Sequence, residues 1–265
     1  MTVRCRLQFE FGCGGLKLAG TLDTAPGVTG LLIVNGGNEI RSGAFSGQSH
    51  LAAALAKKGF PVLRFDRRGT GDSEGENRGF RKSSGDINAA LEAFRAMAPQ
   101  LDRVFAFGNC DAASALMLME GGGFDGLILS NPWIFEDEEE NADEPTHGPE
   151  AIRSRYAEKL KDPKEIGRLL KGGVDLKKLG RGLMSALRSA RPPSNLAQDM
   201  QAGLSTFDGS VHILLAGTDR TAQAFESAWP SSDERIRRCD GAGHAFVELE
   251  HRAWLESQIL AALRS

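Results

Sequence analysis

The sequence predicts an α/β fold, in which a mostly parallel sheet is flanked by helices on both faces. Short apolar runs alternate with segments of helical periodicity, and the loops between them are short. The run Leu31–Val34 is continuously apolar, as expected of a strand that is covered on both faces. Because parallel strands joined through helices make right-handed crossovers, helices are expected on both sides of the sheet.

Eight segments have the pattern of strands. The first two are expected to pair antiparallel around Gly12–Gly15, since a glycine-rich turn joins two short alternating runs. The remaining strands are each expected to enter the parallel part of the sheet. The expected strands are Val3–Phe9, Leu16–Leu22, Leu31–Val34, Pro61–Phe65, Arg103–Phe107, Gly126–Ser130, Val211–Ala216 and Arg235–Cys239.

Helical periodicity fills most of the intervals between these strands. Ser49, Leu51 and Leu55 share one helix face, and Gly59 closes that pattern. Ser84 is expected to cap the next helix, because serine favours that position. The other expected helices are Ser84–Ala98, Ala112–Glu120, Ala222–Trp229 and Phe246–Leu263.

One long segment interrupts the alternation, since no strand pattern lies between Trp133 and Phe207. Residues 136–150 contain eight acidic residues and no Lys or Arg, whereas residues 153–191 contain twelve Lys or Arg against four Asp or Glu. Helix starts are expected at Asp162-Pro163 and at Asp175. We therefore predict a helical cap over residues 133–207, inserted into a core formed by residues 1–132 and 208–265.

The composition excludes several classes of protein. The chain has 265 residues, of which 41% are hydrophobic and 25% charged, so disorder, collagen and coiled coil are ruled out. A net charge of -3 gives no general reason to expect nucleic acid or an anionic membrane as a partner. With no apolar run long enough for a signal peptide or a membrane span, we expect a cytoplasmic protein. The oligomeric state is not predicted.

The four cysteines are scattered, without the spacing of a zinc site, so no metal or other cofactor is expected. We interpret Cys5, Cys13 and Cys239 as reduced thiols of a packed interior. Cys110 differs, because it lies in Gly108-Asn109-Cys110-Asp111-Ala112, directly after a strand and directly before a helix. This pattern has the form of a nucleophile elbow with Cys in place of Ser, where small residues two positions away allow a sharp turn.

Two further residues have the order along the chain that a catalytic triad requires. Asp219 follows the strand Val211–Ala216, and His244 lies in the loop between the last strand and the last helix. Such a His takes the proton of the nucleophile and later protonates the leaving group, while the carboxylate fixes its tautomer. Asp208 and Asp240 remain alternative partners for this His. The other histidines (His50, His147, His212 and His251) are interpreted as structural.

The loop Asn35-Gly36-Gly37-Asn38 follows an apolar strand, at the place where α/β-hydrolases offer a backbone N–H to the oxyanion. Gly37 is the expected donor and Asn38 the reserve, with the N–H of Asp111 as the second donor. Asn35 and Asn38 are expected to contact the substrate. Binding of a phosphate group is disfavoured, because neither glycine-rich phosphate motif is present.

Asp66-Arg67-Arg68-Gly69-Thr70-Gly71-Asp72-Ser73 is similar to the D-x-R-G-x-G-x-S stretch common in α/β-hydrolases, where it shapes a turn. Together these features predict the α/β-hydrolase fold with an inserted helical cap.

The chain further resembles the type 1 exosortase A system-associated hydrolases. The residues that carry this resemblance are Asn35-Gly36-Gly37, Asp66-Arg67-Arg68-Gly69, Cys110-Asp111 with Ala112 and Ser114, Leu169–Leu176 and Gly241-Ala242-Gly243-His244. The resemblance implies a bacterial cytoplasmic protein near genes for exopolysaccharide, protein sorting and acyl activation.

The sequence thus favours acyl chemistry on an ester or thioester, by hydrolysis or acyl transfer through an acyl-cysteine. Coenzyme A or an acyl carrier protein would be recruited by the basic cap, unless its cations form only a solvated helix face. Two other readings stay open. Asp111 would be the nucleophile in a dehalogenase-like enzyme, and a non-catalytic member of the fold would bind a ligand or partner in the same pocket.

Overall fold

The computed structural model describes residues 5–135 and 195–265. Apart from three residues next to the undescribed segment (135, 195 and 196), these residues belong to one compact unit. Most of the predicted cap, residues 133–207, lies outside the described part of the chain, as do both charge runs. Its boundaries therefore stay a prediction.

An eight-stranded sheet forms the centre of this unit, in the order β1-β2-β4-β3-β5-β6-β7-β8. The predicted hairpin is present, because β1 and β2 pair antiparallel, and β2 also pairs antiparallel with β4. The pairs from β4 through β3, β5, β6 and β7 to β8 are parallel. The strands are β1 (Arg6–Cys13), β2 (Leu16–Asp23), β3 (Thr29–Val34), β4 (Val62–Phe65), β5 (Arg103–Asn109), β6 (Gly126–Ser130), β7 (Ser210–Ala216) and β8 (Ile236–Cys239).

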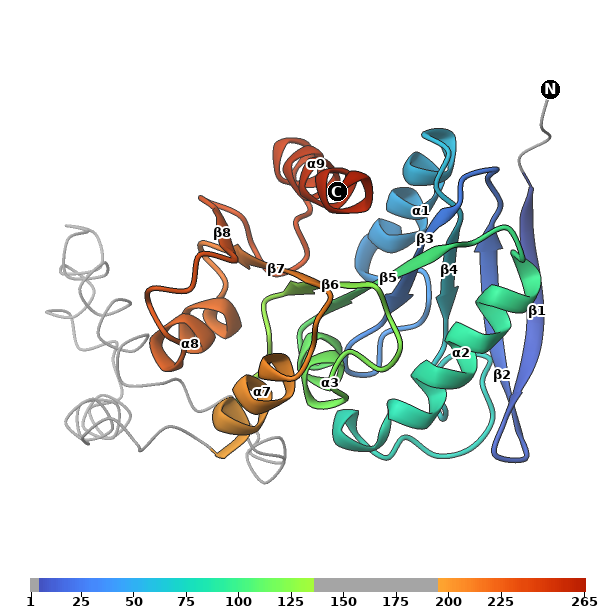
Figure 1. Ribbon diagram of the computed structural model, residues 1–265, viewed down its shortest axis with the longest axis horizontal. Helices are drawn as coiled ribbons and strands as arrows, with labels where there is room; N and C mark the ends of the chain where they lie inside the picture. The colour runs from blue at the N-terminus through green and yellow to red at the C-terminus, as the bar shows by residue number, and fades with distance from the viewer. Residues whose placement is uncertain (1–4, 136–194) are drawn as a thin grey trace, which may run out of the picture. The chain divides into compact units, whose positions relative to one another are not determined.

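Helices cover both faces of the sheet, as predicted (Figure 1). α1 and α9 lie on one face, where their apolar side chains join those of the central strands in one buried cluster. α2 and α3 lie on the opposite face, and α7 packs against α3. The described helices are α1 (Gly47–Lys57), α2 (Ser84–Met97), α3 (Asp111–Leu118), α7 (Asn195–Ser205), α8 (Arg220–Ala228) and α9 (Leu249–Arg264), with the short 3-10 turns η1 (Ala44–Ser46) and η2 (Phe80–Lys82).

The cap predicted for α2 is wrong in detail. Ser83, not Ser84, stands at the N-cap position, and no side chain caps this helix. The hydroxyl of Ser83 instead donates to the carbonyl oxygen of Phe80 at 2.7 Å, because η2 leads directly into the helix. The Ser83 hydroxyl is therefore used by the turn before the helix and does not cap the helix itself.

The topology brings distant residues to one edge of the sheet. β3, β5, β6, β7 and β8 are parallel, so their carboxyl ends lie along the same edge. The loops that follow β3, β5, β7 and β8 contain Gly37, Cys110, Asp219 and His244 respectively. Ligand sites of open parallel sheets form at this edge. Among the described helices none is both long and apolar enough to cross a membrane.

Candidate active site

Cys110 stands at the sharp turn between β5 and α3. Its backbone has φ 61° and ψ -130°, a conformation that residues other than glycine rarely adopt. Gly108 and Ala112 make the turn sterically feasible, since a Cβ on Gly108 would lie 2.8 Å from the backbone carbon of Ala112. The requirement for a small residue before the nucleophile therefore has a direct steric cause. Strain of this kind is typical of functional positions.

His244 and Asp219 lie against each other and against Cys110. The Nδ1 atom of His244 is 2.9 Å from Oδ2 of Asp219, and the side chain of Cys110 is near enough to the ring to raise its pKa. Neither Asp208 nor Asp240 contacts this ring within the described residues, so Asp219 is the carboxylate that reaches it. Asp219 is held in turn, because it is the N-cap of α8 and accepts the N–H of Ala222 at 3.1 Å.

The protonation of His244 follows from these partners. Burial favours the neutral ring, but the hydrogen bonds to Asp219 and Cys110 and their negative charges raise the pKa of His244 from 6.5 to about 10. At neutral pH the ring is therefore an imidazolium that lies beside the side chains of Asp219 and Cys110.

The loops that hold Asp219 and His244 are joined to each other. The backbone N–H and the hydroxyl of Thr218 both donate to the carbonyl of Ala242, at 3.0 and 2.7 Å. Gly217 donates its N–H to Cys239 at the end of β8. These bonds fix the two loops without involving the reacting groups.

Asn131, which sequence analysis did not single out, connects the elbow, the His244 loop and the sheet. Its amide nitrogen donates to Oδ1 of Asn109 at 3.0 Å and to the carbonyl of His244 at 3.2 Å. Its amide oxygen accepts the N–H of Ala216 in β7 at 2.8 Å. The side chain is fully buried and the residue has φ 44°. Its place directly after β6, at the carboxyl edge of the sheet, is the signal that could have identified it.

The predicted oxyanion loop lies beside the elbow, but its donor is already engaged. A Cβ on Gly36 would lie 2.6 Å from the carbonyl oxygen of Asn109 and 3.3 Å from Cβ of Cys110. The N–H of Gly37 donates to Oδ1 of the Asp111 side chain at 2.8 Å. The N–H of Asp111, the second expected donor, donates to no residue within the described ranges.

Arg67 completes this side of the site. Its Nη2 donates to the carbonyl of Gly37 at 2.6 Å and lies 3.3 Å from Oδ2 of Asp111. The guanidinium is buried, and its Nη1 has no partner among the described residues. Arg67 belongs to the hydrolase-like turn that the sequence predicts after β4, where Gly71 has φ +52° and leaves no room for a Cβ beside Asp66.

Asn35 and Asn38 lie at different depths in this loop. Asn35 is fully buried, its amide donates to the carbonyl of Glu39 at 3.4 Å, and its oxygen has no partner among the described residues. Asn38 is exposed and accepts from the amide of Asn77 at 2.9 Å. Only Asn38 is therefore accessible from the surface in this conformation.

Glu39 is a further carboxyl group near the site, and the sequence did not indicate it. Burial raises the pKa of the Glu39 carboxyl, the positive charge of His244 lowers it, and the negative charge of Asp111 raises it further. The nearby N–H of Ala44 also lowers this pKa and so opposes the increase. No group of three His, Cys, Asp or Glu side chains suited to a metal is present in the described residues.

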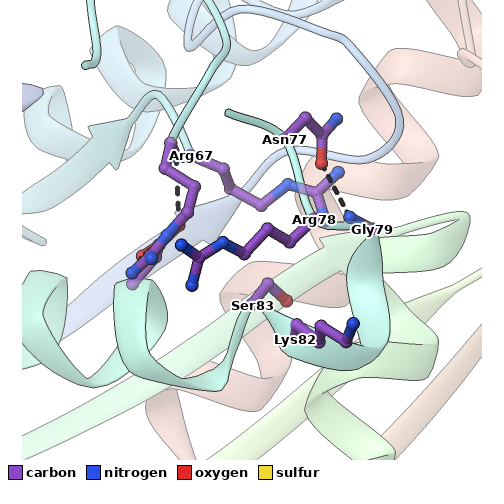
Figure 2. Close-up of a pocket in the computed structure, with 8 residues that line it drawn as sticks. Arg67, Asn77, Arg78, Gly79, Lys82 and Ser83 are labelled. Atoms are coloured by element: carbon purple, nitrogen blue, oxygen red, sulfur yellow. Dashed lines mark hydrogen bonds and ion pairs between the residues drawn. The ribbon is translucent and has the colours of Figure 1, made fainter. Parts of the chain in front are cut away.

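A shallow, open hollow lies next to the oxyanion loop, because Arg67 and Asn77 on its wall bond Gly37 and Asn38 (Figure 2). Arg68 and Asp86 on its wall pair with each other, with Nε 2.7 Å from Oδ1. Arg78 and Lys82 also face it and make no ion pair with any described residue. The lining residues are Arg67, Arg68, Asn77, Arg78, Gly79, Lys82, Ser83 and Asp86.

Comparison with known families gives one match. The hydrolase family described as serine aminopeptidase, S33, matches residues 29–174, which is more than half of the chain. The matched range includes the oxyanion loop, the turn after β4 and the elbow. No curated protein matches the sequence.

Solved structures with this fold are numerous and distant in sequence. The esterase Pf2001 of Pyrococcus furiosus is 16% identical, with a TM-score of 0.64, and the match covers 98% of this chain and 91% of the esterase. The α/β-hydrolase GrgF of Penicillium sp. sh18 is 16% identical, with a TM-score of 0.63 and 98% of both chains covered. XC6422 of Xanthomonas campestris, described as an α/β serine hydrolase without lid, is 14% identical, with a TM-score of 0.59. The match covers 100% of this chain and 96% of XC6422. At these identities the likeness establishes the α/β-hydrolase fold.

Proposed function

The chain belongs to the serine aminopeptidase family S33 of α/β-hydrolases, and we propose that it is a cysteine-dependent enzyme acting on an acyl ester or thioester. Cys110 is the nucleophile, His244 the general base and acid, and Asp219 the carboxylate that orients the ring. One observation carries the proposal: a cysteine at the strained elbow faces a histidine that is itself held by a half-buried carboxylate at 2.9 Å.

The reaction proceeds in two steps. The thiolate of Cys110 attacks the acyl carbon, and the oxyanion that forms accepts hydrogen bonds from the N–H groups of Gly37 and Asp111. The intermediate collapses as His244 gives its proton to the departing thiol or alcohol, which leaves an acyl-cysteine. Water or an acceptor then attacks this acyl group, and His244 takes the proton of the attacking group as the thiolate departs.

Thioesters fit this site better than simple esters. The acyl-cysteine is itself a thioester, so transfer from one thioester to another is nearly balanced in free energy. Cleavage of a peptide bond, which the family description names, would start from a more stable amide. We therefore propose thioester hydrolysis or acyl transfer, with the acceptor unspecified.

An anionic carrier such as coenzyme A or an acyl carrier protein is the second part of the proposal. Two cations of the hollow, Arg78 and Lys82, support it, since neither forms an ion pair with another described residue. The basic run of the predicted cap lies outside the described residues. KM for an acyl-coenzyme A should rise with ionic strength, because salt screens the attraction. A KM that stays constant would refute the proposal of an anionic carrier.

The resemblance to exosortase-associated hydrolases leads us to propose a cytoplasmic role beside such a sorting and exopolysaccharide system.

The test is to incubate the protein with acyl thioesters and to measure the intact mass. An acyl adduct that maps to Cys110 and is lost in Cys110→Ala is the expected result. Cys5→Ala is the matched control, because Cys5 is exposed and directly precedes the edge strand β1; the interior position predicted for this thiol is wrong. No adduct on the wild type, together with unchanged turnover in Cys110→Ala, would refute the proposal. Fast alkylation near neutral pH also separates an activated thiol from that of a non-catalytic binding protein.

A further inference from the structure

The side chain of Asp111 occupies the place where the proposed reaction needs an oxyanion. Its Oδ1 accepts the N–H of Gly37 at 2.8 Å, and this N–H is the expected oxyanion donor. Oδ1 also lies 3.0 Å from the position of a Cβ on Gly36, a position that is itself 3.3 Å from Cβ of Cys110. The carboxylate is therefore in the immediate surroundings of the nucleophile.

A carbonyl oxygen cannot use this donor while the carboxylate holds it. The two acceptors compete for one hydrogen, and the negative charge of Asp111 repels the charge that develops on the carbonyl oxygen. Donors that stabilise an oxyanion must point at the oxygen without first being released from another strong acceptor.

Arg67 offers the carboxylate a second position. Its Nη2 already lies 3.3 and 3.4 Å from the two carboxylate oxygens, which is longer than an optimal charge-assisted bond. Its Nη1 is buried and has no acceptor among the described residues. A guanidinium binds a carboxylate best through two parallel N–H groups, and an unpaired buried N–H is unfavourable. A short rotation of Asp111 toward Arg67 would correct both features.

We propose that Asp111 is a positioning residue that closes the oxyanion site in the free enzyme and moves onto Arg67 when substrate binds; this inference rests on the proposed function. The rotation breaks the bond from the Gly37 N–H to Oδ1 and forms a bond from Nη1 of Arg67 to the carboxylate. The N–H of Gly37 then donates to the substrate carbonyl. The Gly37 N–H thus exchanges one acceptor for another, and Nη1 of Arg67 gains the acceptor that it lacked.

The opposing hypothesis is that Asp111 simply ties the oxyanion loop to α3. The two hypotheses predict opposite results for one pair of variants. Asp111→Ala removes the side chain that closes the site, so acylation of Cys110 should become about tenfold faster. Asp111→Asn keeps an acceptor for the Gly37 N–H but loses its attraction to Arg67, so acylation should become slower than in the wild type. A purely structural tie predicts that alanine is the more damaging replacement.

Arg67 provides the second half of the experiment. Arg67→Ala removes the alternative position for the carboxylate, and acylation should fall about tenfold or more. Adding Asp111→Ala to this variant should restore the rate to the level of Asp111→Ala alone. Arg95→Ala, at an exposed arginine of α2, is the matched control and should behave as the wild type. A double variant slower than either single variant would overturn the inference.

The rates are measured as the acylation burst with 4-nitrophenyl acetate and with an acetyl thioester. Alkylation of Cys110 by iodoacetamide, which forms no oxyanion, is measured in parallel, and thermal unfolding verifies that each variant is folded. If the wild type is acylated and Asp111→Ala is slower while its alkylation persists, this inference fails and the proposed function stands. If the wild type is neither acylated nor rapidly alkylated, both fail.

Discussion

The two halves of the candidate site are held by different kinds of interaction. The nucleophile half contains the ion pair of His244 with Asp219, and neutral amide groups and backbone bonds at Asn131 and at the Thr218–Ala242 link hold the loops around it. In contrast, the oxyanion half depends on the charged contacts of Asp111 and Arg67 with Gly37. It contains two buried atoms without a described partner, Oδ1 of Asn35 and Nη1 of Arg67, whereas the nucleophile half contains one, Oγ of Ser130.

This difference indicates which half is preorganised. A buried polar network in which each group has a partner is rigid, whereas an unpaired buried group costs about 1–3 kcal/mol and favours a neighbouring arrangement that satisfies it. The nucleophile half is therefore ready to react, and the oxyanion half must rearrange. Substitutions in the nucleophile half should therefore abolish activity, whereas substitutions in the oxyanion half should change the rate of acylation.

The largest effect is expected within the nucleophile half. Asp219→Asn keeps the shape of the side chain but removes the negative charge that orients His244 and stabilises its protonated form. We therefore expect kcat for an acyl thioester to fall by about 10²–10⁴. Asp240→Asn is the control, because Asp240 is near in sequence to His244 but does not contact its ring. A comparable loss in Asp240→Asn would show that the wrong carboxylate has been assigned.

The next largest effect tests the oxyanion half through two adjacent glycines. At Gly36 a methyl group would meet the Asn109 carbonyl at 2.6 Å and Asp111 Oδ1 at 3.0 Å, whereas nothing lies within 4 Å at Gly37. Gly36→Ala should therefore displace the loop and lower the acylation rate about 10- to 100-fold.

Gly37→Ala serves as the comparison for this prediction. Its φ of +53° makes alanine strained by about 1–2 kcal/mol, but the loop keeps its place. The stability of Gly37→Ala should fall while its acylation rate stays within a few-fold of the wild type. If Gly37→Ala were instead the slower enzyme, crowding at Gly36 would not be what fixes this loop.

The same contrast explains what the sequence could predict. The positions of β3, β5 and β7 follow from apolar runs, and Gly108 follows from the steric needs of a sharp turn. Proximity of Cys110 and His244 then results from the parallel topology, which places strand ends along one edge. Local patterns of this kind depend on nearest neighbours and are visible in one chain.

Contacts between side chains of different loops are not visible in this way. The sequence predicts Arg67 only as part of a turn, and it does not reveal that the guanidinium reaches Gly37 and Asp111. Likewise, Asp111 is expected to contribute its backbone N–H, but its carboxylate is what meets Gly37. Glu39 is inconspicuous until burial and its charged neighbours raise its pKa.

A smaller effect is expected at Asn131, the residue that joins the nucleophile half. Asn131→Ala leaves the N–H of Ala216 and the carbonyl of His244 without their side-chain partner, which should lower the free energy of unfolding by about 1–3 kcal/mol. Asn131→Gly loses the same bonds but tolerates the φ of 44°. Denaturant unfolding should therefore find the glycine variant more stable than the alanine variant by about 1 kcal/mol. Equal stabilities would mean that the backbone at this position is not strained.

The smallest effect is the dependence of stability on pH that His244 introduces. Since its pKa is raised from 6.5 to about 10 in the folded protein, the folded state binds a proton more tightly than the unfolded state. The resulting stabilisation is complete below about pH 6.5 and is lost as the pH rises through about 10. The His244 side chain is 35% exposed, so solvent screening reduces the effect, and we expect a change in Tm of about 2 °C.

The measurement is the difference in Tm between the wild type and His244→Gln from pH 6 to pH 10.5. Cys13 and Cys239, whose pKa values are raised by burial, also titrate in alkaline solution, but they are present in both proteins and cancel in the difference. The difference should shrink toward high pH. A difference that stays constant would show that His244 is not held as an imidazolium, and the nucleophile half would then be no better prepared for reaction than the oxyanion half.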